Sequence, residues 1–538
     1  MSRPKARWWT LCLLSLLLSG IAAAATTAPV RLDSGLLEGD LLDAASGLRV
    51  FRGIPYAAPP VGDLRWRPPQ RVAAWEGVRA AKEFGAICPQ PPMLAAMTGE
   101  TLPPSNEDCL YLNVWTAARA DAALPVMVWI HGGGLSLGWS QQAVYDGAAF
   151  AGRGVVLVSI NYRLGPLGFL SLPELSRESE HRSSGNYGFL DQVAALEWVQ
   201  RNVAAFGGDP NNVTIFGESA GGTSVHALLT SPRAAGLYHR AIAESPWITE
   251  SNIAPLRQAS PFGPSAEDQG ATWASRLVAA GGDSSLAALR RIPAAEIIAK
   301  SNLGFQPLIA IDGWFMPENG ERTFAAGKGT KVPLIAGSNT DEGTMFQSGL
   351  GYGTVSAYRD GLSKIYGDQA QAVLALYPAS SDQELSTTLN RYLTDTWFLR
   401  ATRGMLLGAA RAGAPTYQYH FTLRSRAVPA WGAHHAAELG FVFNNPAGFG
   451  GATPVPEWNE AERRLADAMI GYWVQFATTG DPNRDGLPVW PKFDAGTESY
   501  LELGETIRAA DRLCAGRCEQ LDRILGAVQA KEPQTGGR

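Results

Sequence analysis

The stretch Val213-Thr-Ile-Phe-Gly-Glu-Ser-Ala-Gly-Gly222 decides how the rest of the chain is interpreted. An apolar, β-branched run leads into a turn of small residues that carries Ser219, and residues 220–230 then have the pattern of a helix. Gly217 and Gly221 flank the serine in a Gly-x-Ser-x-Gly pattern. Glycines at these positions allow a tight strand-to-helix turn to hold a serine in strained backbone geometry. We therefore predict a nucleophile elbow with Ser219 at its tip.

The composition is that of a globular protein. Of the 538 residues, 46% are hydrophobic and 18% are charged, so the chain can bury a sizeable core. Its length suits one to three domains. Because no repeat and no linker interrupts residues 26–538, we expect a single domain there. The formal net charge is -5 and we find no stripe of Lys and Arg, which does not favour a nucleic-acid partner.

Residues 1–25 have the pattern of a secretory signal peptide. Three cationic side chains precede the apolar run 8–18, and small residues then provide an Ala-x-Ala cleavage site near Ala24 or Ala25. The apolar run is shorter than the roughly 20 residues that a membrane-spanning helix needs, and no later run is long enough. We expect an exported protein, secreted or periplasmic, with no stable membrane span.

The cysteines support export. Cys12 lies in the leader, and the other four form two local sets, Cys88 with Cys109 and Cys514 with Cys518. An even number of cysteines in an exported chain suggests two disulfides. The alternative is a metal site with four thiolate ligands, but the two sets lie far apart in the sequence and their spacing is loose for zinc. We expect no metal, and whether Cys514 and Cys518 bond to each other stays open.

Apolar runs bounded by turn signals predict buried strands, and amphipathic stretches predict helices. The predicted strands are residues 30–38, 48–53, 110–116, 125–130, 155–161, 213–216, 332–337 and 416–422. The predicted helices are residues 190–205, 220–230, 267–280, 285–291, 294–300, 354–366, 382–407 and 460–479. This alternation is typical of an open parallel sheet wound with helices, which is an α/β fold. Ligands of such sheets bind beyond the carboxyl ends of the strands, where Ser219 lies.

A run of glycines, His131-Gly-Gly-Gly134, follows the predicted strand 125–130. Consecutive glycines let backbone N–H groups point inward with no side chain in the way, which is what an oxyanion hole requires. The simpler interpretation of this run alone is a flexible turn. Its combination with an elbow further along the chain favours the oxyanion hole.

A serine nucleophile needs a base and a carboxylate, which follow it in the order Ser, acid, His on this architecture. Five of the seven histidines fit this order poorly, namely His131, His181, His226, His239 and His420. His434 and His435 remain, and spacing does not choose between them. For the acid, Asp341 and Glu342 both follow the predicted strand 332–337, and either could serve.

Several motifs lie in this order along the chain: Glu107-Asp-Cys-Leu-Tyr-Leu-Asn-Val114, His131-Gly-Gly-Gly134, Asn161-Tyr-Arg-Leu-Gly165, Gly185-Asn-Tyr-Gly-Phe-Leu-Asp-Gln192 and the stretch from Phe206 to Gly222. Together they resemble the type-B carboxylesterase/lipase family, the cholinesterase-like branch of the α/β-hydrolases. The resemblance covers nearly all of the chain after the leader. It implies an α/β-hydrolase fold, with a large, mostly parallel central sheet flanked by helices and helical insertions over the active site. The implied activity is that of a serine esterase, which cleaves small-molecule carboxylic esters through an acyl-enzyme and needs no cofactor.

The resemblance also implies a site, residue by residue. The nucleophile corresponds to Ser219, the acid of the catalytic triad to Glu342 and the base to His435. By the same resemblance, the oxyanion hole is formed by the backbone amides of Gly133, Gly134 and Ala220. Glu218 and Ser245 are implied to support the acid and the base. Cys88 and Cys109 are implied to form a disulfide.

Two departures from the family pattern bear on the substrate. The loop 89–108 has no tryptophan for a choline group, so we do not expect a choline ester. Pro246 replaces the small residue that is usual after Ser245, and Trp247 follows it. We therefore place Trp247 in the substrate pocket, together with Trp139, which follows the glycine run.

The sequence leaves the substrate open. An amide, carbamate or lactone hydrolase with the same triad is one alternative, and a non-catalytic binding protein on the same fold is another. The intact Ser219, Glu342 and His435 argue against the second alternative. The oligomeric state is also left open.

Overall fold

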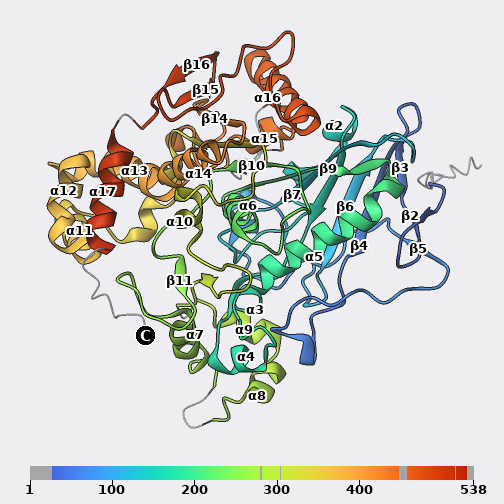
Figure 1. Ribbon diagram of the computed structural model, residues 1–538, viewed down its shortest axis with the longest axis horizontal. Helices are drawn as coiled ribbons and strands as arrows, with labels where there is room; N and C mark the ends of the chain where they lie inside the picture. The colour runs from blue at the N-terminus through green and yellow to red at the C-terminus, as the bar shows by residue number, and fades with distance from the viewer. Residues whose placement is uncertain (1–26, 279–281, 303, 448–456, 515, 530–538) are drawn as a thin grey trace, which may run out of the picture.

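The computed structural model describes residues 27–278, 282–302, 304–447, 457–514 and 516–529, so the predicted leader lies outside the described residues. The strands of its largest sheet are β3 (Asp40–Asp43), β4 (Leu48–Pro55), β6 (Tyr111–Thr116), β7 (Leu124–Ile130), β8 (Val156–Ile160), β9 (Gly208–Glu218), β10 (Arg240–Glu244), β13 (Leu334–Asn339), β14 (Thr416–Phe421), β15 (Ser499–Leu503) and β16 (Ile507–Asp511). They form an 11-stranded sheet in the order β16-β15-β14-β13-β10-β9-β7-β8-β6-β4-β3 (Figure 1).

The middle of this sheet is parallel, from β8 through β7, β9, β10, β13 and β14 to β15. Antiparallel pairs close both edges. The register pairs Glu218 at the end of β9 with Glu244 at the end of β10, and Glu244 with Gly337 of β13. The carboxyl ends of these strands are therefore level, and the loops that follow them meet at one edge. The predicted α/β fold with a mostly parallel sheet is confirmed.

Helices cover both faces of the sheet (Figure 1). They are α1 (Met93–Thr98), α2 (Ala148–Ala151), α3 (Gly165–Phe169), α4 (Pro173–Glu178), α5 (Tyr187–Asn202), α6 (Ala220–Thr230), α7 (Ala266–Ala274), α8 (Leu286–Arg291), α9 (Ala294–Ala299), α10 (Gly320–Ala325), α11 (Val355–Tyr366), α12 (Ala370–Leu376), α13 (Asp382–Leu393), α14 (Arg400–Arg411), α15 (Leu439–Val442), α16 (Glu460–Thr479) and α17 (Arg517–Gln529). Along β7, Val126 and Val128 belong to a core cluster with residues of α5 and α6, whereas Met127 and Trp129 pack with residues of α15 and α16. Burial on both faces explains the continuous apolar runs of the central strands.

A third core cluster lies beside the sheet, at the left of Figure 1, and is built by α11, α12, α13 and α17. The sequence predicts one helix over residues 382–407. The structure divides this stretch into α13, a π-helical turn η7 (Thr394–Leu399) and α14. Single π turns widen a helix by one residue and often occur at functional sites.

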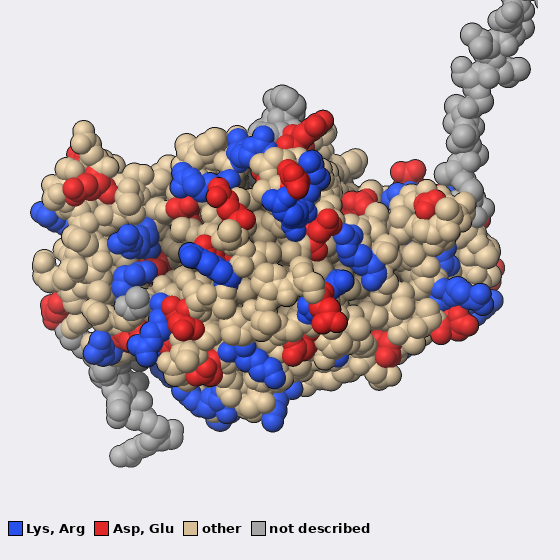
Figure 2. Space-filling model, turned by 90° about the horizontal axis from the view of Figure 1, so that it is seen from above, with Lys and Arg blue, Asp and Glu red and all other residues tan. Residues whose placement is uncertain are grey.

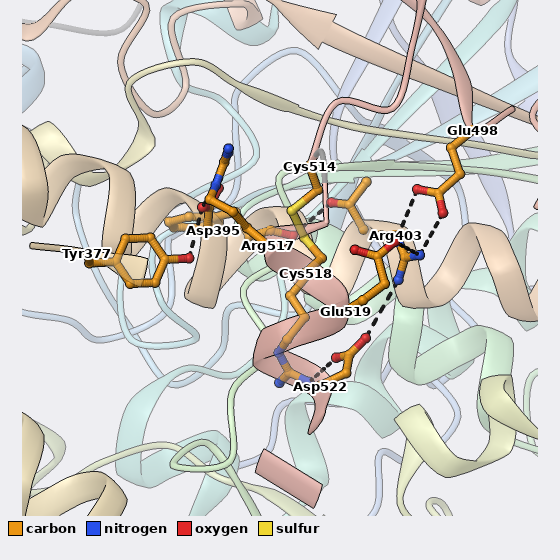
Figure 3. The surroundings of a disulfide bond; sticks show 12 residues. Tyr377, Asp395, Arg403, Glu498, Cys514, Arg517, Cys518, Glu519 and Asp522 are labelled. Atoms are coloured by element: carbon orange, nitrogen blue, oxygen red, sulfur yellow. Dashed lines mark hydrogen bonds and ion pairs between the residues drawn. A yellow bond between two sulfur atoms is a disulfide. The ribbon is translucent and has the colours of Figure 1, made fainter. Parts of the chain in front are cut away.

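Both predicted sets of cysteines are bonded. Cys88 pairs with Cys109, as the resemblance implies, and Cys514 pairs with Cys518. The second disulfide lies at the start of α17. Ion pairs with Asp395 and Arg403 also hold this helix against the rest of the protein (Figure 3). Arg517 Nε lies 2.7 Å from a carboxylate oxygen of Asp395 in η7. This ion pair attaches α17 to η7, whereas the disulfide closes a short loop at the start of the same helix.

The surface carries both signs of charge. Lys and Arg side chains are interspersed with Asp and Glu side chains over the face shown in Figure 2. Within the described part of the chain, no helix combines the length and the apolar character needed to cross a membrane.

Candidate active site

Ser219 occupies a strained turn between β9 and α6. Its backbone has φ 58° and ψ -120°, a conformation that non-glycine residues rarely adopt. The neighbouring glycines allow this turn because a Cβ atom on Gly217 or Gly221 would lie 2.5 or 2.0 Å from the carbonyl oxygen of Ile130. The backbone N–H of Ser219 donates to the carbonyl of Glu244 at 2.9 Å. The elbow is thus packed directly against the ends of β7 and β10.

The glycine run after β7 lies beside this turn. A Cβ atom on Gly132 would lie 3.1 Å from Cβ of Ser219, so only glycine permits the close approach. Gly133 has φ 106° and Gly134 has φ 61°, which point the peptide groups in directions that favour glycine. Ala220 begins α6, and the amides of a first helical turn have no partner within the helix. The three predicted oxyanion donors therefore come from segments that meet at Ser219.

Glu342 and His435 are in contact. Glu342 lies in the turn η4 (Glu342–Met345) after β13 and is fully buried, and its Oε2 lies 2.5 Å from Nδ1 of His435. Its other oxygen, Oε1, accepts hydrogen bonds from the Ser245 hydroxyl and from the backbone N–H of Asn339, both at 2.6 Å. The carboxylate is held on both oxygens and fixes the orientation of the imidazole ring.

The structure distinguishes the candidates that spacing alone leaves open. Asp341 accepts hydrogen bonds from the backbone N–H of Ala433 and from the side chain of Asn390, and it does not bond His435. Nδ1 of His434 lies 2.7 Å from the carbonyl oxygen of His435, so this ring bonds the backbone next to it. Of these four residues, only Glu342 and His435 bond each other through their side chains.

Glu218 contacts the other side of the His435 ring. Its Oε1 lies 3.1 Å from Nε2 of His435, although neither atom has a well-directed hydrogen-bond partner in the described residues. Among the described residues, no hydrogen bond joins Ser219 Oγ to His435. Burial raises the pKa of Glu218 well above its usual range, and the nearby charge of Glu342 raises it further. Glu218 therefore favours its neutral form beside His435.

Two further buried carboxyl groups, which sequence reasoning assigned no role, lie behind the site. Glu244 is fully buried, and its Oε1 accepts a hydrogen bond from Nε1 of Trp473 at 2.7 Å. Burial raises the pKa of Glu244 to about 8. Glu438 accepts a hydrogen bond from the Asn339 side chain, and burial together with the nearby charge of Glu342 raises its pKa well above the usual range. Neutral acids at these positions limit the repulsion within the cluster.

Glu244→Gln is expected to reduce the loss of stability at high pH. Below its folded-state pKa of about 8, Glu244 keeps a proton that the unfolded chain loses above pH 4.5. The free energy of unfolding of the wild type should therefore fall by about 1.4 kcal/mol per pH unit between these values and level off above them. Glutamine has no proton to release and keeps an acceptor for Trp473. Urea unfolding between about pH 5 and 9 measures the free energy of unfolding of both proteins. The difference between variant and wild type should shift in favour of the variant by about 1.4 kcal/mol per pH unit up to about pH 8. A difference that stays constant with pH would contradict a neutral Glu244.

The two predicted pocket tryptophans differ in their surroundings. Trp139 is 1% exposed and packs with Ile87, Leu94 and Leu137 beneath the segment closed by the first disulfide. Trp247 is partly exposed and follows β10 at the same sheet edge as Ser219. The placement of either ring in a substrate pocket stays a prediction.

Two phenylalanines that the sequence does not single out pack on His435. The ring centroid of Phe398 lies 4.7 Å from that of His435, and the centroid of Phe346 lies 5.1 Å from it. Phe346 follows Glu342 in the same loop, which is a signal that the sequence offers. Phe398 has no such signal because it comes from the π-helical turn η7. No group of three or more His, Cys, Asp or Glu side chains in the described residues is arranged to hold a metal ion.

The chain is similar to known esterases in sequence and in fold. Residues 26–521 match the profile of the carboxylesterase family. The chain is 37% identical to fumonisin B1 esterase of Sphingopyxis macrogoltabida over 506 residues, which cover 92% of this chain and 90% of the relative. It is 36% identical to para-nitrobenzyl esterase of Bacillus subtilis over 478 residues, which cover 86% and 92%. A solved thermophilic PNB esterase superposes with a TM-score of 0.80 at 32% identity, covering 92% of this chain and 99% of its own.

Proposed function

This chain belongs to the carboxylesterase family and is a carboxylic ester hydrolase, and we propose that it cleaves its ester through an acyl-enzyme formed on Ser219. The observation that carries this proposal is the 2.5 Å contact between His435 Nδ1 and Glu342 Oε2, at the sheet edge where the strained Ser219 lies. Ser219 is the nucleophile, His435 is the general base and Glu342 orients the imidazole.

In the first half of the reaction, Ser219 Oγ attacks the carbonyl carbon of the ester while its proton passes to Nε2 of His435. Because Nδ1–H donates to Glu342, Nε2 carries the lone pair that accepts this proton. The catalytic hydrogen bond between serine and histidine commonly tightens only when substrate is bound. Binding of the ester then draws Nε2 from Glu218 toward Ser219.

The carbonyl oxygen becomes negatively charged in the tetrahedral intermediate. The backbone N–H groups of Gly133, Gly134 and Ala220 donate hydrogen bonds to it, which stabilises the developing charge. His435 then gives its proton to the alkoxide, and the alcohol leaves. In the second half, His435 takes a proton from water, the hydroxide attacks the acyl-enzyme, and the carboxylic acid departs as Ser219 regains its proton. No cofactor takes part in either half.

Glu218 and Ser245 support the triad in this proposal. Ser245 donates to the Glu342 oxygen that does not face His435, so it holds the carboxylate in place. Glu218 lies next to the imidazole in its neutral form, which leaves Glu342 as the charged partner of the His435 cation formed during the reaction.

Labelling with a fluorophosphonate tests the proposal directly. We expect one phosphonate adduct per chain, on the tryptic peptide that contains Ser219, because only an activated serine beside oxyanion-hole donors reacts rapidly with such a reagent. Mass spectrometry of the digest identifies the labelled residue, and an excess of ester substrate should slow the labelling. An adduct on a different residue, or no adduct, would refute the assignment of Ser219.

We further propose that the protein is exported, secreted or periplasmic, and that residues 26–538 form one domain. The charge and apolar pattern of residues 1–25 supports export. The two disulfides also support it, because such bonds persist in oxidising compartments. A single domain is supported by the largest sheet, which takes strands from both ends of the described chain, from β3 to β16.

A further inference from the structure

A row of aromatic rings leads away from the candidate triad. The Phe346 ring meets His435 edge-on, and the Trp397 centroid lies 5.5 Å from that of Phe346. The Trp247 centroid lies 6.0 Å from that of Trp397. We call Phe346, Trp397 and Trp247 the aromatic wall.

The backbone of Trp247 is fixed to the helix that carries the nucleophile. The Thr223 hydroxyl in α6 accepts a hydrogen bond from the backbone N–H of Trp247 at 3.0 Å and lies 2.7 Å from its carbonyl oxygen. The backbone N–H of Thr223 in turn donates to the carbonyl of Ser219 at 2.8 Å. This end of the wall therefore has a set position relative to the attacking oxygen.

The other end of the wall is positioned by the helical cluster beside the sheet. Trp397 and Phe346 pack against the cluster formed by α11, α12, α13 and α17. The π-helical turn η7 places two consecutive rings differently, with Phe398 buried against His435 and Trp397 partly exposed beside Phe346. A hydrogen bond from the N–H of Ile248 to the carbonyl of Trp397, at 3.3 Å, joins the two ends.

The side chains of the aromatic wall are only partly covered, although Nε1 of Trp247 is itself buried. Phe346, Trp397 and Trp247 are each partly exposed, whereas their chain neighbours Pro246, Ile248 and Phe398 are buried. A tightly packed core would cover all six side chains. Aromatic side chains that are only partly covered beside a reacting centre offer a planar apolar group both burial and favourable ring–ring geometry.

We propose that the aromatic wall binds an aromatic ring of the ester. Esters whose aromatic ring is not conjugated with the ester group are then the preferred substrates. This inference rests on the proposed function, because it assumes that the ester reacts at Ser219 beside the wall. The ring can belong to the acyl part or to the alcohol part, since both extend from the same carbonyl. The two sources are separated by the substrates used in the test.

The test compares esters that differ only in having a flat ring. For the acyl side we would measure kcat/KM for ethyl phenylacetate and ethyl cyclohexylacetate, and for the alcohol side for benzyl acetate and cyclohexylmethyl acetate. In at least one pair, the wild type should prefer the aromatic ester by about 3- to 10-fold, the range expected for ring–ring contacts beyond simple burial. Ethyl acetate, which reaches no ring, serves as the reference for basal turnover.

Variants then assign the preference to the wall. Trp247→Leu and Trp397→Leu keep an apolar side chain but remove the ring, so the ratio of kcat/KM between the aromatic and the saturated ester of a pair should fall to about one. Trp314→Leu is the matched control, because this partly buried tryptophan packs against His181 and Arg233 instead. It should keep the preference of the wild type.

A second measurement needs no variant. Benzyl alcohol should inhibit the wild type competitively at a concentration several-fold lower than cyclohexylmethanol does. Equal inhibition by the two alcohols would assign the bound ring to the acyl part. Equal kcat/KM values within both ester pairs, or an unchanged substrate ratio in the double variant Trp247→Leu/Trp397→Leu, would overturn the proposal. Normal hydrolysis of ethyl acetate in that case leaves the triad assignment intact. A wild type that hydrolyses none of these esters would instead contradict the proposed function.

Discussion

Ser219→Ala is expected to lower kcat for a simple aryl acetate by about 10⁴-fold or more, with a residual rate from the oxyanion-hole donors and binding alone. The reason is that alanine keeps the elbow but has no oxygen to attack the ester. Ser219 Oγ has no hydrogen-bond partner in the described residues, and the main-chain bond to Glu244 is unaffected by the substitution. The free energy of unfolding should therefore change by less than about 1 kcal/mol.

Steady-state kinetics and urea unfolding of the same preparation check both parts of this prediction. The contrast between a large loss of turnover and a small change in stability is what identifies a nucleophile. Turnover within about tenfold of the wild type would exclude Ser219 from covalent catalysis.

His435→Ala should cost as much activity as the loss of the nucleophile, about 10⁴-fold in kcat/KM, because residues of a triad act as one unit. Without the imidazole, no base takes the proton of Ser219, and the buried Glu342 loses the partner 2.5 Å away. The neighbouring His434 provides a matched comparison, since both histidines are almost fully buried in the same loop.

His434→Ala should instead leave kcat/KM within about tenfold of the wild type and lower the free energy of unfolding by about 1–3 kcal/mol. Its ring bonds the carbonyl oxygen of His435 rather than a side chain of the triad. Ester kinetics and denaturant unfolding of the two variants separate a catalytic from a structural histidine. The reverse ranking of the two activities would assign the base to His434.

The central strands could be predicted from the sequence because burial on both faces demands apolar residues at every position. β7 shows this directly as a continuous apolar run, and β13 begins with one before it ends in Gly-Ser-Asn. β10 was not predicted, although it lies between β9 and β13. Its sequence, Arg-Ala-Ile-Ala-Glu, is short and rich in alanine, which has a low strand propensity. Pairing with its two neighbours, and not local preference, makes this segment a strand.

The helical stretch at 382–407 shows the same limit. Its amphipathic pattern predicts helix correctly, but the π-helical turn η7 in its middle depends on packing against the neighbouring cluster. Asp395 within this turn bonds Arg517 of the C-terminal helix, far away in the sequence. No local pattern carries that information.

The sequence by itself determined the fold class and one candidate nucleophile, Ser219, because an elbow and a glycine run are local requirements of backbone geometry. It left two candidates each for the acid and the base, and only the resemblance to a family implied Glu342 and His435. The tertiary structure decided which side chains meet. It joined His435 to Glu342 and gave Asp341 other partners. It also gathered buried acids behind Ser219, and it brought rings from two loops and from η7 into the aromatic wall. These contacts join residues far apart in the chain, and their energies come from burial and electrostatic interactions that exist only once the sheet has brought the strand ends together.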